Sequence, residues 1–184
     1  MTPREQEEYR ALRATIRERG TARIWIFVSG LAAWAAATLA TAGLSAPPVA
    51  TLVPLLVLAA AFEGVFALHI GVERIGRYLQ VFFEGDAETA RWEHAAMAFG
   101  TPKGAAGLDA LFSIPFLLAA IFNVLPALIV EPTSAELIFI GGAHALFLLR
   151  LGVARDVAKK QRAIDLERFR ELQRSTQSAQ RSQS

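Results

Sequence analysis

Four long apolar segments constrain the fold of this chain more strongly than any other feature. Each is close to the ~20 residues that a helix needs to cross the ~30 Å hydrocarbon core of a bilayer. The sequence therefore predicts an all-α, polytopic membrane protein built on a four-helix bundle. The predicted spans cover about residues 24–43, 49–71, 108–130 and 135–151.

The positions of Lys and Arg predict the orientation of these spans. Six precede the first span, four lie between the second and third, and nine follow from Arg150 onward, which accounts for all 19. The two remaining short segments between spans contain none. Because cytoplasmic loops of membrane proteins are enriched in Lys and Arg, we expect both termini and the middle loop to be cytoplasmic, and the protein to lie in the cell (inner) membrane.

Helices are also expected on the cytoplasmic side of the spans. The sequence Thr2-Pro3-Arg4-Glu5 has the pattern of a capping box, which predicts the start of the first of these helices. The residues from Thr133 to Glu136 have the same pattern and predict the start of the fourth span. The last ten residues are too polar to bury a core and are predicted to be disordered. The predicted cytoplasmic helices cover about residues 3–19, 72–84, 87–99 and 152–173 of a single membrane domain, 1–174, which precedes the disordered tail 175–184.

The second span carries an apolar seam that continues beyond the predicted membrane boundary. Its residues recur in steps of three and four, the heptad spacing of packed helices. We expect this seam to pack against cytoplasmic helices of the same chain or against the same helix of other subunits. A bundle of four spans is small for enclosing a pathway within one chain. A homo-oligomer is therefore favoured. The seam consists of Val65, Leu68, Val72, Ile75, Leu79 and Phe82.

A polar face lies opposite this seam. Glu73 and Arg77 are spaced as an i,i+4 ion pair in the favourable order, and Gln80 and Glu84 fall in the same sector. Charged helix faces are usually exposed. We therefore expect a solvated ladder of ion pairs on the cytoplasmic part of this helix.

Glu63 is the most unusual ionisable residue, because it falls inside a predicted span. An ionised carboxylate at such a depth costs ~2.5 kcal/mol or more, so it is protonated, paired or facing water. His69, Asn123 and His144 fall at other depths in the spans and, together with Glu63, would form a path for protons or cations. The structural alternative is a protonated Glu63 bonded to a neighbouring helix, or one that reaches toward the inner interface.

Other kinds of chemistry have little support in the sequence. The chain has no cysteine, and its net charge of +2 is too small to indicate nucleic acid binding. No catalytic motif, metal site or cofactor site is predicted. Two functions remain: a homo-oligomeric channel or transporter in the lipid bilayer, and a non-catalytic accessory or scaffold protein that binds a protein partner through its cytoplasmic helices.

Overall fold

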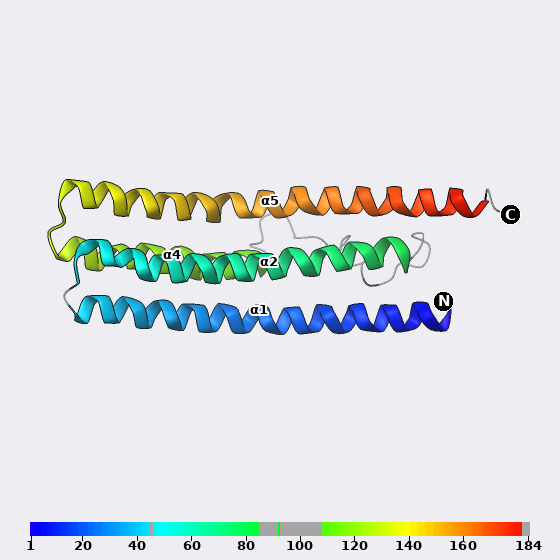
Figure 1. Ribbon diagram of the computed structural model, residues 1–184, viewed down its shortest axis with the longest axis horizontal. Coiled ribbons are helices and arrows are strands. Elements are labelled where there is room, and N and C mark those ends of the chain that lie inside the picture. Colours follow the sequence, from blue (N-terminus) through cyan, green and yellow to red (C-terminus); the bar gives the residue numbers. More distant parts are fainter. Residues whose placement is uncertain (45, 85–91, 93–107, 182–184) are drawn as a thin grey trace. The chain divides into compact units, whose positions relative to one another are not determined.

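The computed structural model describes residues 1–44, 46–84, 92 and 108–181 (Figure 1). Every regular element within these residues is helical, which confirms the all-α prediction. The predicted helix over 87–99 lies outside the described residues, apart from Trp92. The elements are α1 (Pro3–Gly43), the 3-10 helix η1 (Pro48–Thr51), α2 (Leu52–Phe82), α4 (Leu108–Ile129) and α5 (Ser134–Arg181).

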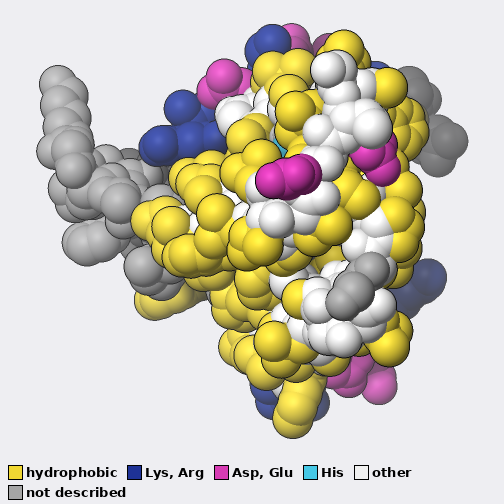
Figure 2. All heavy atoms as spheres, turned by 90° about the vertical axis from the view of Figure 1, so that its left-hand side faces the viewer, with side chains coloured by type: hydrophobic (Ala, Val, Ile, Leu, Met, Phe, Trp, Pro, Cys, Tyr) yellow, Lys and Arg dark blue, Asp and Glu magenta, His cyan; other side chains and the backbone are white. Residues whose placement is uncertain are grey.

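Three of the described helices are long and apolar enough to cross a membrane. They lie within Pro3–Gly43, Pro48–Phe82 and Ser134–Ala179, and a shorter apolar helix covers Ser113–Ile129. Hydrophobic side chains also cover most of the surface seen in Figure 2, the left-hand side of Figure 1. These features fit a membrane protein, as the sequence predicts.

Both predicted capping boxes are present. The Thr2 amide donates to Glu5 Oε2 at 2.7 Å, and the Glu5 amide donates to Thr2 Oγ1 at 3.3 Å. At the start of α5, the Thr133 amide donates to Glu136 Oε2 at 2.9 Å, and the Glu136 amide donates to Thr133 Oγ1 at 3.3 Å. The role of Glu136 is therefore to cap the start of α5.

Two helices are longer than the sequence predicts. α1 is uninterrupted from Pro3 to Gly43, whereas the predicted elements leave a break between residues 19 and 24. α5 continues to Arg181, through most of the tail that is predicted to be disordered. Once a helix has formed, each added residue gains one backbone hydrogen bond, so residues 175–181, which include no Gly or Pro, can extend α5. In α1 the single Gly20 costs only about 1 kcal/mol relative to Ala and does not interrupt the helix.

The chain divides into two compact units. The charged unit comprises Met1–Thr21, Leu68–Ala105 and Asp156–Ser184, and the apolar unit comprises Ala22–Ala67 and Ala106–Arg155. By sequence, 16 of the 19 Lys and Arg residues belong to the charged unit, and the other three are Arg23, Arg150 and Arg155.

Aromatic rings fill the core of the apolar unit. The Phe62 ring lies edge-on to Phe116 and Phe147, with centroids 5.4 and 6.1 Å apart. Phe27 of α1 contacts Phe116 in a similar way at 5.7 Å. These rings and the fully buried Leu58 link α1, α2, α4 and α5. In Figure 1, α2 passes in front of α4 in this unit.

In the charged unit, aromatic contacts join α2 to both other helices. Tyr78 lies 5.5 Å from the Phe169 ring of α5, and Phe83, just past α2, lies 5.7 Å from Tyr9 of α1. The seam residue Phe82 also contacts Phe169, at 6.3 Å. Two seam residues, Val65 in the apolar unit and Leu79 in the charged unit, are buried, and Leu68, Val72, Ile75 and Phe82 are partly buried. Much of the seam is thus covered within one chain.

Gly30 provides a sharp test of the packing between α1 and α2. A Cβ atom at this position would lie 2.3 Å from the Ala61 Cβ, so Gly30→Ala forces the two helices apart. Overpacking of this kind costs about 1–3 kcal/mol, and we expect a lower midpoint of thermal unfolding in detergent. Gly142→Ala is the control, because nothing lies within 4 Å of its added Cβ. Equal midpoints for the two variants would contradict this packing.

Candidate functional site

The apolar unit contains a buried polar network centred on Asn123. This residue of α4 has an exposed fraction of 0%. Its Oδ1 accepts a hydrogen bond from Trp34 Nε1 at 3.0 Å and lies 3.5 Å from Thr38 Oγ1, whose hydroxyl also donates to the Trp34 carbonyl at 2.9 Å. Its Nδ2 donates to the Thr51 carbonyl at 2.8 Å and lies 3.1 Å from His144 Nε2. Both donors of the amide therefore have a partner, and its oxygen accepts from the Trp34 indole.

The contacts of His144 indicate which of its nitrogens carries the proton. His144 Nδ1 lies 2.8 Å from the Ile140 carbonyl. A carbonyl can only accept, so we assign the hydrogen to Nδ1, and Nε2 then accepts from the Asn123 amide. The imidazole is neutral in this arrangement. The structure thus brings together two of the four predicted path residues, Asn123 and His144, in a closed network.

Glu63 does not contact this network but forms an ion pair with Arg150. The Glu63 carboxylate is held by Arg150 Nε at 2.7 Å and by Nη2 at 2.8 Å, a two-point contact. The guanidinium also lies over the Phe66 ring, 4.6 Å from its centroid, and 5.6 Å from the Phe62 centroid. The Glu63 side chain nevertheless remains 50% exposed.

Arg150 is the residue of this candidate site that the sequence analysis does not identify. The charge pattern counts it with the basic segment that follows the fourth span, although it lies within the predicted bounds of that span, 135–151. An Arg side chain can extend along apolar surface while its charged end finds a partner. Its position inside the predicted fourth span, the property that singles out Glu63 in the second span, is the signal that could have identified it.

Buried apolar side chains separate the ion pair from the Asn123 network. Along α2, Leu55, Leu58 and Phe62 come between Thr51 and Glu63, and all three are buried. Along α5, the buried Phe147 comes between His144 and Arg150. Within the described part of the apolar unit, the candidate residues therefore do not form one continuous polar path.

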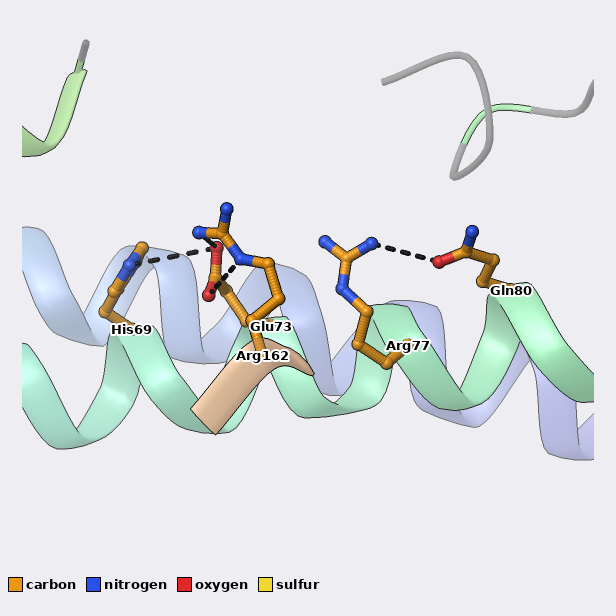
Figure 3. A network of polar contacts seen from close by, with 5 residues as sticks. All are labelled: His69, Glu73, Arg77, Gln80 and Arg162. Atoms are coloured by element: carbon orange, nitrogen blue, oxygen red, sulfur yellow. Dashed lines mark hydrogen bonds and ion pairs between the residues drawn. The ribbon is translucent and has the colours of Figure 1, made fainter. Parts of the chain in front are cut away.

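The remaining predicted residues belong to the charged unit (Figure 3). Arg162 of α5 holds the Glu73 carboxylate through Nε, at 3.0 Å from Oε2, and through Nη2, which pairs with Oε1. His69 Nε2 lies 3.9 Å from the same carboxylate. Arg77 Nη1 donates to Gln80 Oε1 at 3.0 Å. Glu73 thus joins α2 to α5.

The expectation of a solvated polar face on α2 is wrong for most of its length. Arg77, Gln80 and Glu84 are buried, and Glu73 is partly buried. The reason is that α2 has helices on more than one side in this unit: Glu84 lies 3.9 Å from Arg13 of α1, and the Val81 carbonyl accepts from Gln173 of α5 at 2.8 Å.

Further polar links join the same helices. Arg74 Nε of α2 contacts Asp165 Oδ2 of α5 at 3.1 Å, and Gln161 Nε2, one turn before Asp165 in α5, donates to Asp165 Oδ1 at 2.9 Å. The Tyr78 hydroxyl donates to Glu8 Oε1 at 2.7 Å. Among the residues that the structure describes, no group of three His, Asp or Glu side chains is arranged to hold a metal ion.

Replacing Asn123 tests the buried network. Asn123→Ala removes the network's central amide and leaves Trp34 Nε1 and the Thr51 carbonyl without this partner. We expect a loss of about 1–3 kcal/mol in the free energy of unfolding, measured by denaturant titration in detergent. Ser29→Ala is the control, because its exposed hydroxyl donates only within α1. Its effect should stay within about 0.5 kcal/mol, and a similarly small effect for Asn123→Ala would contradict a stabilising network.

A double-mutant cycle tests the link between Glu73 and Arg162. The single variants Glu73→Gln and Arg162→Gln should each destabilise the protein, and the double variant should lose less than their sum. We expect a coupling of about 1 kcal/mol for a partly exposed pair of this geometry. Arg170→Gln, at an exposed position of α5, is the control. A coupling of zero would show that the pair contributes nothing to stability.

Comparison with known proteins gives no further assignment. No protein-family model matches the chain, and neither a curated protein nor a solved structure is significantly similar to it. The functional conclusion therefore rests on the residues and contacts described above.

Proposed function

We propose that this protein is a four-span membrane protein, with both termini in the cytoplasm, that acts as an accessory or scaffold subunit. Its charged unit binds a partner protein, and its apolar unit anchors that surface in the inner membrane. The observation that carries this proposal is the closed Asn123 network. A buried amide whose oxygen and both N–H groups have partners inside the chain favours a static bundle over a conduit.

The composition of the two units supports the topology. The N-terminal segment, the segment between α2 and α4, and the C-terminal segment all belong to the charged unit. Four spans with both ends inside would place these same three segments on one side of the membrane. Their content of Lys and Arg favours the cytoplasmic side.

The charged unit offers a surface for a partner. In the part of α5 that belongs to this unit, exposed basic residues outnumber exposed acidic ones: Lys159, Lys160, Arg168, Arg170, Arg174 and Arg181 against Asp156, Glu167 and Glu171. The interhelical contacts of Glu73, Asp165 and Tyr78 support a fixed arrangement of its helices. A prearranged charged surface recognises a complementary partner at a lower entropic cost than a flexible one. We therefore propose that the partner presents an acidic surface.

A second candidate function, an ion path, is favoured by one observation. Glu63 is half exposed on the apolar unit, although it is paired with Arg150. A path that includes Glu63 would run along the outside of one chain, between subunits. Asn123 and His144 would then stabilise the fold and would not carry ions.

Reconstitution into liposomes distinguishes the two functions. For a scaffold, wild-type protein gives proton and cation fluxes equal to those of empty liposomes. For an ion path, wild-type protein carries a flux that Glu63→Gln abolishes, because this variant removes the charge with little change in size. A flux that depends on Glu63 would overturn the scaffold proposal.

Purification from native membranes tests the partner surface. We expect a partner to copurify with the wild-type protein in stoichiometric amount, and the Lys159→Glu/Lys160→Glu variant to retain at least about tenfold less of it, because like charges repel across an interface. Glu131→Gln, an exposed change in the apolar unit, is the control. Equal recovery with all three proteins would contradict binding through this face of α5.

A further inference from the structure

One side of α2 in the apolar unit is exposed along its whole length. Its residues follow steps of three and four: Val53, Leu56, Ala60, Glu63 and Ala67. Val53 and Leu56 are 56% and 69% exposed. This is the heptad spacing of a helix that packs against another helix. It lies on a different side of α2 from the buried seam residue Val65.

The pairing of Glu63 with Arg150 joins this side of α2 to α5. Around Arg150, the α5 residues Leu146 and Val153 are exposed. The ion pair is therefore surrounded by exposed apolar side chains on both helices. Leu56 of α2 and Leu146 of α5 precede the paired residues in sequence, and Ala67 of α2 and Val153 of α5 follow them.

Lipid chains can cover the apolar part of this surface but not the ion pair. A half-exposed carboxylate in contact with hydrocarbon is costly, even when it is paired. The cost falls when the exposed side meets polar groups of complementary charge. Ala60 and Ala67 lie one turn to either side of Glu63, and small residues at such positions allow two helices to approach closely in lipid.

We propose that this surface binds a second copy of the same chain. The surface comprises the exposed residues Val53, Leu56, Ala60, Glu63 and Ala67 of α2 with Arg150 of α5. Charge complementarity favours a copy related by a two-fold axis along the membrane normal. That symmetry places the negative Glu63 of each chain near the positive Arg150 of the other. The inference extends beyond the partner surface on the charged unit and does not depend on it.

Cysteine crosslinking provides the first test, because the chain has no cysteine of its own. Ala60→Cys and Ala67→Cys should each form a disulfide-linked dimer when oxidised in native membranes. Ala40→Cys is a matched control at an exposed position of α1. We expect at least about tenfold more dimer from the α2 positions than from the control, because only close positions can be bridged. Equal yields from the three variants, or no dimer from the α2 positions, would overturn the proposal.

Charge reversal in separate copies provides the second test. Glu63→Arg copies and Arg150→Glu copies each carry like charges at the proposed contact, so each should associate at least about tenfold more weakly than wild type. Two different affinity tags, one on each variant, allow mixed pairs to be recovered from membranes that contain both. In a mixed pair, one copy has arginine at both positions and the other has glutamate at both. Opposite charges then face each other at both contacts, and mixed pairs should form at wild-type levels.

The charge-reversal experiment and a stability measurement in nanodiscs together show whether something other than a second copy covers the surface. Failure of the mixed pairs to form, with both variants folded as judged by thermal unfolding, would overturn a direct contact between copies. A monomeric wild-type protein whose stability rises with the fraction of anionic lipid in nanodiscs, and whose Arg150→Gln variant loses that rise, would assign the surface to lipid headgroups. Either result would overturn the proposal.

Discussion

The hydrogen bonds of the Asn123 side chain are the interaction on which the apolar unit most depends. Helices in lipid gain little from hydrophobic burial against each other, so their arrangement relies on close packing and on polar contacts between them. Asn123 contacts α1 through Trp34, η1 through the Thr51 carbonyl directly before α2, and α5 through His144. One amide of α4 therefore contacts α1, η1 and α5, and the rings around Phe62 and Phe116 add α2 to the same core.

The charged unit is held by contacts of another kind. Glu73, Asp165 and Tyr78 each contact a residue of a second helix through a charged or hydroxyl group. Such contacts are weaker where water reaches them, and their contribution depends on geometry and salt. The apolar unit relies on a satisfied buried network, whereas the charged unit combines aromatic packing with several partly exposed links. The two units should therefore respond differently to ionic strength.

The sequence predicts features that depend on position along one helix and misses those that depend on neighbours around it. The apolar segments, both capping boxes and the all-α class follow from local patterns. Asn123 and His144 stand out in the sequence as polar residues within spans, but spacing along the chain gives only their depth. The partner of Glu63 is missed because Arg150 lies 87 residues away. The burial of Arg77 and Gln80 is missed for the same reason, since a charged face is exposed only where no other helix covers it.

Phe62 links the interior of the apolar unit to its surface. One part of its ring packs against Phe116 and Phe147, while the Arg150 guanidinium lies beside it, 5.6 Å from its centroid. The orientation of the surface charge is thus set partly by the volume of a core side chain. In homologous chains, positions 62, 63 and 150 are therefore expected to vary as a group, with a smaller residue at 62 accompanied by a changed or absent charge at the other two.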